Sequence, residues 1–184
     1  MAKWIALLRG INVSSQKLIR MRALEASCAA LGWRDVRTYL QSGNVVFSAG
    51  KGIGAAQHGL AGALQARVAS DFTHDVQVRV LAAREIDSLV RSNPLLTRKG
   101  VQENALYATF LFAPVAEDRF SQLELPIRPG EEAHLLGQVV CLHCPHGYGN
   151  TKLNNTFFER KLQVTATTRN WRTVLALRDL CQKR

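Results

Sequence analysis

Residues 36–48, VRTYLQSGNVVFS, decide the fold, because two β-rich segments flank a short run of turn-forming residues. Valine, threonine, tyrosine and phenylalanine favour extended backbone, whereas Ser42-Gly43-Asn44 has the composition of a turn. The sequence therefore predicts strands at Val36–Gln41 and Val45–Ser48, with Gly43-Asn44 as a two-residue type II′ connection. These residues therefore predict an antiparallel hairpin, and the other strands and helices of the first half are assigned relative to it.

Further elements are predicted on both sides of this hairpin. Trp4–Leu8 is a short, almost continuous apolar run that predicts a buried strand. A helix that ends at Gly32 follows from the three-and-four spacing of Leu18, Met21, Leu24, Cys28 and Leu31. A second helix, running to about Ser70, follows from Ile53, Leu60, Leu64 and Val68, and Val76–Leu81 predicts a strand. Residues 4–81 thus have the βαββαβ order of a ferredoxin-like motif.

The second half repeats this order less completely. Strands are predicted at Leu106–Phe112, Ala133–Leu136 and Gln138–His143, with a vestigial fourth at Val164–Thr168. Helices are predicted at Ala82–Arg91, near Glu117–Leu123, from Thr151 and from Asn170. Asn93-Pro94 ends the helix before it and marks the boundary between domains 1–92 and 93–184. We expect an α+β protein with duplicated ferredoxin-like βαββαβ subdomains, antiparallel sheets and an extra C-terminal helix.

Charge and composition restrict the class of protein. Of the 184 residues, 24 are Lys or Arg and 14 are Asp or Glu, which gives a net charge of +10. Both ends of the chain are basic and the middle is slightly acidic. This balance favours an anionic partner, either a nucleic acid or a phosphorylated ligand, although an Arg-rich solvated surface is the alternative explanation. No apolar run is long enough to cross a bilayer, so no membrane partner is predicted.

The cysteine and glycine patterns argue against metal and nucleotide sites. Cys141, His143, Cys144 and His146 crowd together without the paired spacing of a zinc site, so no metal or other cofactor is predicted. Gly50–Gly54 matches neither phosphate-loop pattern and is expected to be a flexible loop. No secretory leader precedes the four cysteines, which predicts reduced thiols and a cytoplasmic protein. Known catalytic signatures and the aromatic RNA-recognition signature are absent.

Polar residues at strand ends and helix starts form the candidate ligand-binding set. They are Arg9, Asn12, Lys17, Gln41, Ser42, Asn44, Lys152, Asn154, Asn155, Arg169, Asn170 and Trp171. Each also has a structural explanation as a turn residue, a helix N-cap, a solvated charge or a core side chain. In a ferredoxin-like half the first two strands finish at the same end of the sheet. Arg9, Asn12 and the hairpin amides are therefore expected to converge there.

The sequence also resembles a known bacterial family. The similarity lies in Ile5–Val13, Ser42–Phe47, the block from His143-Cys144-Pro145 through Gly147-Tyr148-Gly149 to Lys152–Asn155, and Thr168–Trp171, in the family's order. These blocks resemble domain of unknown function 1697. The resemblance covers nearly the whole chain and implies a compact α+β fold of two similar ferredoxin-like subdomains. It implies a stand-alone cytosolic protein and brings no established activity, substrate or cofactor.

Three hypotheses for function follow from the residues. The first is a cytosolic binding protein for an anionic ligand, a phosphorylated metabolite or nucleic acid. The second is a small-molecule enzyme without a recognisable motif, in which Arg9, Asn12, Gln41 and Asn44 clamp an oxyanion or carboxylate. In the third the motif residues only fix the interface between the two subdomains. Charge and the polar residues at helix starts favour the first.

Overall fold

A computed structural model describes residues 1–13, 15–50 and 56–183. Most of the predicted Gly50–Gly54 loop and the helix position Ile53 lie outside the described residues. The chain groups into two compact units, one of Met1–Asp87 with the segment from Ala176 onward and one of Ser88–Leu175. The division into domains 1–92 and 93–184 stays a prediction. Over the described residues, no helix combines the length and apolar character needed to cross a bilayer.

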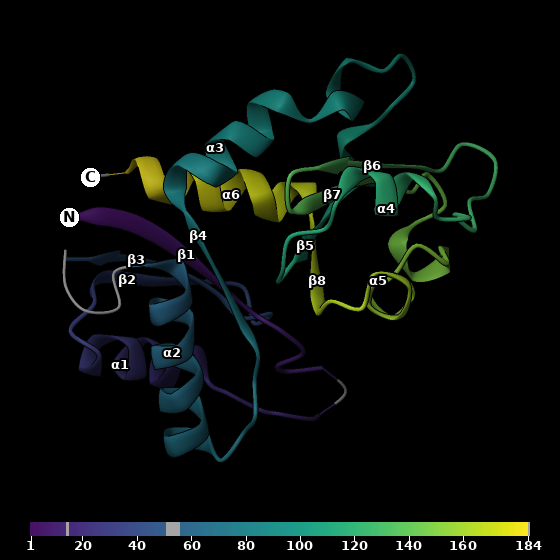
Figure 1. The fold of residues 1–184 in the computed structure, drawn as a ribbon. Coiled ribbons are helices and arrows are strands. Elements are labelled where there is room, and N and C mark those ends of the chain that lie inside the picture. The colour runs from purple at the N-terminus through teal and green to yellow at the C-terminus, as the bar shows by residue number, and fades with distance from the viewer. Residues whose placement is uncertain (14, 51–55, 184) are drawn as a thin grey trace. The chain divides into compact units, whose positions relative to one another are not determined.

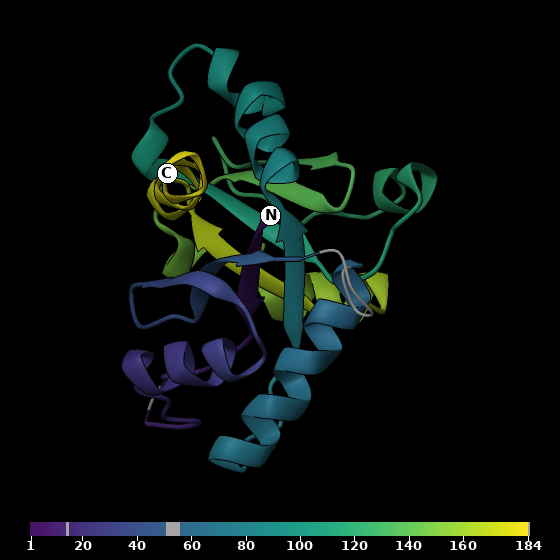
Figure 2. The ribbon, with the colours of Figure 1, turned by 90° about the vertical axis from the view of Figure 1, so that its left-hand side faces the viewer.

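The first unit contains the predicted βαββαβ order. Its elements are β1 (Ala2–Leu8), α1 (Met21–Ala30), β2 (Arg34–Tyr39), β3 (Asn44–Ala49), α2 (Gln57–Phe72) and β4 (Val78–Ala82). The strands form an antiparallel sheet in the order β2-β3-β1-β4, with Ile5 opposite Val46 and Leu81. Both α1 and α2 cover the same face of this sheet (Figures 1 and 2). Strands β3 and β1 therefore lie in the middle of the sheet, with β2 and β4 at its two edges, as in a ferredoxin-like motif.

The core of the first unit lies between the sheet and these two helices. Alternate β1 residues, among them Ala6 and Leu8, pack in one cluster with Leu24 of α1 and Leu64 of α2. The ring of Trp33 stacks on Phe47 at 3.7 Å between centroids. Leu60, Leu64 and Val68 are buried in α2, as the helical spacing predicted. Burial of each such side chain contributes about 1.5–3 kcal/mol, which holds the helices on the sheet.

The hairpin turn differs from the prediction. Tyr39 pairs with Asn44, so residues 40–43 form the connection and the two-residue type II′ turn was wrong. Leu40 has φ 55° and Gly43 has φ 77°, so the connection has two left-handed positions, whereas the predicted turn needed only one, at Gly43. Asn44 belongs to β3 instead of the turn because its backbone pairs with Tyr39 and Leu7, and its side-chain amide also donates to the Tyr39 carbonyl oxygen at 2.8 Å.

The first helix begins later than its apolar spacing predicted. It starts at Met21, and Leu18 is 63% exposed instead of facing the core. Ile19 is the buried residue of this segment, and its backbone N–H donates to the side chain of Asn12. A loop held by Asn12 therefore replaces the predicted first turn of the helix.

The second unit contains the same strand order as the first. The elements from residue 83 onward are α3 (Ala83–Ser92), β5 (Leu106–Leu111), α4 (Glu117–Ser121), β6 (Glu132–Leu136), β7 (Val139–His143), α5 (Asn155–Leu162), β8 (Ala166–Asn170) and α6 (Trp171–Gln182). Short 3₁₀ helices occur at Pro94–Thr97, Glu103–Ala105 and Tyr148–Asn150. The antiparallel sheet has the order β6-β7-β5-β8. Strand β8 pairs with β5 along its five residues, so it is a full strand rather than the vestigial one expected.

The helices α4 and α5 supply the core of the second unit. Leu153, Phe157, Phe158 and Leu162 are all buried, as predicted, and they cluster with Leu142 of β7, but α5 begins at Asn155 rather than at Thr151, so Leu153 precedes the helix. The duplicated ferredoxin-like α+β fold predicted from the sequence is confirmed, with two antiparallel sheets of four strands each.

Candidate functional site

Asn12 ties the loop after β1 to the β2–β3 hairpin. Its Nδ2 donates to the Gln41 carbonyl oxygen at 2.8 Å and to the Ile19 carbonyl oxygen at 3.0 Å. Its Oδ1 accepts the Ile19 N–H at 2.8 Å. The predicted convergence of Asn12 with the hairpin is therefore observed. Since both amide protons are used, this side chain organises the backbone at the end of the sheet where β1 leaves it.

The other predicted residues of the first unit have different surroundings. Asn44 is fully buried, and its Nδ2 also donates to Ser42 Oγ at 3.0 Å. Gln41 and Ser42 are exposed and Arg9 is half-buried. The Lys17 ammonium group donates to the Asp75 carbonyl oxygen, in the segment before β4. The structure thus brings Asn12, Gln41, Ser42 and Asn44 together, whereas their role in ligand binding stays a prediction.

Two predicted residues of the second unit are helix N-caps. Asn154 Oδ1 accepts the Phe157 N–H at 3.0 Å at the start of α5. Asn170 Oδ1 accepts the Thr173 N–H at 2.8 Å at the start of α6. A side-chain oxygen that accepts such an N–H stabilises a helix by roughly 1 kcal/mol. These two asparagines therefore have the structural role that the sequence left open.

Asn155 joins a half-buried hydroxyl network centred on Thr168. Thr168 Oγ1 donates to Asn155 Oδ1 at 2.7 Å and accepts the Tyr148 hydroxyl at 3.0 Å. Because its single proton goes to Asn155, Thr168 also accepts from Thr109, whose Oγ1 lies at 2.7 Å. Burial raises the pKa of Tyr148, and the bond to Thr168 partly opposes that rise. This network links β5, β8 and the start of α5.

The remaining predicted residues are Lys152, Arg169 and Trp171. Lys152 is exposed, whereas Trp171 is 1% exposed at the start of α6. Arg169 is buried, and its guanidinium donates to Thr167 Oγ1 at 2.8 Å and to the Thr168 carbonyl oxygen at 2.9 Å. Burial lowers the pKa of Arg169 to about 10. At that pKa the side chain stays cationic at neutral pH, so a positive charge is held inside the protein.

A basic hollow of about 160 Å³ lies in the first unit, and sequence reasoning missed it. Lys3 of β1, Arg37 of β2 and Lys183 after α6 line it together with Asp35 and Ser48. Ser48 Oγ donates to Asp35 Oδ2 at 2.9 Å, and the Lys3 ammonium group donates to the Lys183 carbonyl oxygen. The two ends of the chain lie side by side here (Figure 1). No local motif signals this hollow, because its cationic residues are spread over the entire sequence.

A larger hollow of about 370 Å³ lies in the second unit. It is lined by Gly100, Gln102, Asn104, Ala105, His143, Cys144, Pro145 and Gly147. The last four belong to the block on which the family resemblance rests. Its lining therefore joins the end of β7 to the segment just before β5, and no residue of the predicted binding set takes part.

In the cluster of Cys141, His143, Cys144 and His146, the thiols are buried and the two histidine rings contact backbone carbonyl oxygens. Cys141 and Cys144 are buried, and burial raises the pKa of each thiol to about 12. His146 Nε2 lies 3.1 Å from the Pro129 carbonyl oxygen. Over residues 1–13, 15–50 and 56–183, no three His, Cys, Asp or Glu side chains are arranged to hold a metal ion. All four cysteines are free.

Taken together, the two sheets and their helices define an α+β protein with duplicated ferredoxin-like subdomains. The chain belongs to the family described as protein of unknown function (DUF1697), whose model matches residues 1–140. A solved structure of a conserved bacterial protein from Streptococcus pneumoniae is similar to it, with a TM-score of 0.73 and 19% sequence identity over 98% of each chain. That likeness shows the fold. No curated protein matches the sequence.

Proposed function

We propose that this protein binds a small anionic ligand, such as a phosphorylated metabolite, in the basic hollow of the first unit. The observation that carries the proposal is the gathering of Lys3, Arg37 and Lys183 around one hollow. Asp35 is the one acidic side chain among the described lining residues, and Ser48 already donates to it. Guanidinium and ammonium groups bind phosphate oxygens through charge-assisted hydrogen bonds.

The size of the hollow favours a small ligand over a nucleic acid. A volume of about 160 Å³ holds one anionic group and little more. A nucleic acid instead contacts a series of basic side chains along an extended surface, and its binding weakens steeply with salt. The net charge of +10 supports attraction of either partner from solution. We place this function in the cytoplasm, since all four cysteines are free, as is usual in a reducing compartment.

Isothermal titration with ribose 5-phosphate, and with inorganic phosphate, tests this proposal. Sodium chloride at matched ionic strength is the reference, and a single-stranded oligonucleotide is titrated at 50 and 200 mM salt. We expect ribose 5-phosphate to bind the native chain and Arg37→Gln to weaken this binding at least tenfold. Arg34→Gln is the matched control, because Arg34 is exposed on the same strand and does not line the hollow.

Two results would contradict this function. Equal binding of ribose 5-phosphate to the Arg37→Gln and Arg34→Gln variants would place any anion site elsewhere. Binding of the oligonucleotide alone, with a loss of several orders of magnitude between the two salt concentrations, would replace the small ligand by a nucleic acid.

A further inference from the structure

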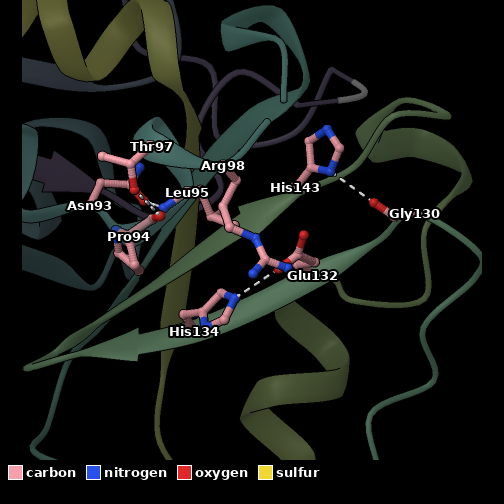
Figure 3. Close-up of polar contacts among 9 residues, drawn as sticks. All are labelled: Asn93, Pro94, Leu95, Thr97, Arg98, Gly130, Glu132, His134 and His143. Atoms are coloured by element: carbon pink, nitrogen blue, oxygen red, sulfur yellow. Dashed lines mark hydrogen bonds and ion pairs between the residues drawn. The ribbon is translucent and has the colours of Figure 1, made fainter. Parts of the chain in front are cut away.

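The orientation of the His143 ring indicates a second candidate binding site, separate from the basic hollow. Its Nδ1 lies 2.8 Å from the Gly130 carbonyl oxygen. Because a carbonyl oxygen only accepts, Nδ1 carries the proton of this hydrogen bond. In the neutral ring, Nε2 is then a bare acceptor. Figure 3 shows Nε2 on the side of the ring away from Gly130.

The acceptor belongs to a largely buried side chain but is itself accessible. His143 is 8% exposed, and the contact with Gly130 is the one polar contact that the described residues give its side chain. Nε2 is not one of the described buried side-chain atoms that lack a partner, so it is accessible from outside the protein and can accept a proton from a bound molecule. His143 lines the 370 Å³ hollow, which provides the space for such a partner.

The lining of the hollow indicates the chemistry of that partner. Gln102 and Asn104 add exposed side-chain amides, which both donate and accept hydrogen bonds. Pro145 and the buried Cys144 add apolar surface, and no Lys, Arg, Asp or Glu occurs among the described lining residues. The Cys144 thiol is too well buried to serve as a nucleophile. A hollow with neutral polar groups and an apolar wall suits a small uncharged molecule that carries hydroxyl or amino groups.

We propose that the hollow lined by His143, Gln102 and Asn104 is a binding site for a small uncharged polar molecule that donates a hydroxyl or amino proton to His143 Nε2. The volume of about 370 Å³ lies within the usual range of small-molecule pockets, roughly 300–1,000 Å³. This site differs in charge and in position in the chain from the basic hollow, so either can exist without the other.

Nuclear magnetic resonance of the full chain tests this site, with adenosine and ribose as uncharged probes. Long-range ¹H–¹⁵N spectra report the two ring nitrogens of His143 separately. We expect at least one probe to shift the Nε2 resonance, together with the side-chain amide signals of Gln102 and Asn104, while Nδ1 keeps its hydrogen-bonded position. Failure of both probes to shift these signals would overturn the proposal.

Variants separate binding from folding. His143→Asn keeps an amide donor near the position of Nδ1 and removes Nε2, so probe affinity should fall at least tenfold. His134→Asn is the matched control, since His134 is half-buried outside the hollow and its Nε2 already donates to Glu132 (Figure 3). Gln102→Ala and Asn104→Ala alter exposed residues and provide a second measurement if His143→Asn unfolds the chain. Unchanged affinity in these alanine variants, or in a folded His143→Asn, would contradict the site.

Discussion

The side-chain amide nitrogen of Asn12 lies 2.8 Å from the Gln41 carbonyl oxygen, so a single side chain in the loop after β1 holds the turn between β2 and β3. Asn12 belongs to one of the blocks that carry the family resemblance, and Gln41 directly precedes another, Ser42–Phe47. Asn12 has φ 55°, a left-handed conformation that asparagine tolerates better than most residues. Its conformation and its hydrogen bonds are therefore both required for the loop.

Asn12→Gly and Asn12→Ala separate these two requirements. Glycine keeps the left-handed backbone and loses the hydrogen bonds, which should lower the free energy of unfolding by about 1–3 kcal/mol. Alanine should cost about 1–2 kcal/mol more, because its Cβ also opposes the left-handed conformation. Urea denaturation measures both values. Equal stability of Asn12→Ala and the native chain would contradict this role.

Gly43→Ala should be more damaging than Gly32→Ala. Both glycines have nearly the same left-handed backbone, with φ 77° at Gly43 and φ 78° at Gly32. A Cβ at Gly43 would lie 2.8 Å from Leu8 Cβ, whereas one at Gly32 would meet nothing within 4 Å. Gly32→Ala should thus lose about 1–2 kcal/mol and Gly43→Ala about 1–3 kcal/mol beyond that. Thermal unfolding of the pair provides the comparison, and equal losses would show that the turn moves to relieve the contact.

Thr168→Val tests the hydroxyl network of the second unit. Valine has nearly the same shape but leaves Thr109, Tyr148 and Asn155 without their shared partner. We expect a loss of about 1–3 kcal/mol in unfolding free energy, because the buried Thr109 and the half-buried Tyr148 and Asn155 would each lose a hydrogen bond. Thr156→Val, at an exposed position in α5, is the control and should change stability by less than about 0.5 kcal/mol. A similar effect of both substitutions would rule out the network as a source of stability.

The ion-pair cluster at Glu132 predicts a pH dependence. The His134 ring, and then the Arg98 guanidinium at 2.9 Å, hold the pKa of Glu132 below its usual 4.5 (Figure 3). A lowered pKa in the folded state means that the carboxylate stabilises the fold above its unfolded pKa and loses this effect as pH falls through the folded value. Glu132→Gln should therefore be less stable than the native chain at pH 7 and equal to it at strongly acidic pH.

Urea midpoints at pH 7, 4.5 and 2 measure this difference. Glu124→Gln, at an exposed carboxylate, is the control and should show no such dependence. A Glu132→Gln deficit that stayed constant down to pH 2 would mean that the carboxylate charge is not its source. Half a molar salt should reduce the deficit at pH 7, since Glu132 and Arg98 are both partly exposed.

The order of strands and helices was predictable because it depends on local patterns. Continuous apolar strands such as Trp4–Leu8 and the helical spacing of Leu60, Leu64 and Val68 need no long-range information. Leu18 misled the same method, because its apolar side chain extends the helical spacing into a loop that Asn12 holds. In this segment the hydrogen bond between the Ile19 N–H and the Asn12 side chain determines the backbone, and the apolar spacing does not.

The candidate sites were much less predictable. Lys3 and Lys183 are separated by 180 positions and meet only after the chain has folded. His143 was recognised as part of a polar cluster, yet its orientation depends on the Gly130 carbonyl oxygen, which no sequence pattern reveals. Asparagines at helix starts were found readily, and the structure gives Asn154 and Asn170 the role of caps. Sequence patterns identify residues that shape the backbone more readily than residues that line a cavity.

The irregular pairing of β2 with β3 affects how the outer edge of this sheet can meet another chain. The register shifts between Arg34 and Arg37, where Asp35 adopts φ 52°. Strand β2 lies at one end of the sheet order, so its outer backbone groups are not covered by another strand of that sheet. A bulge and two arginines interrupt the flat ladder that a strand from another molecule would need. The same irregularity that brings charged side chains to the sheet thus also protects its edge against aggregation.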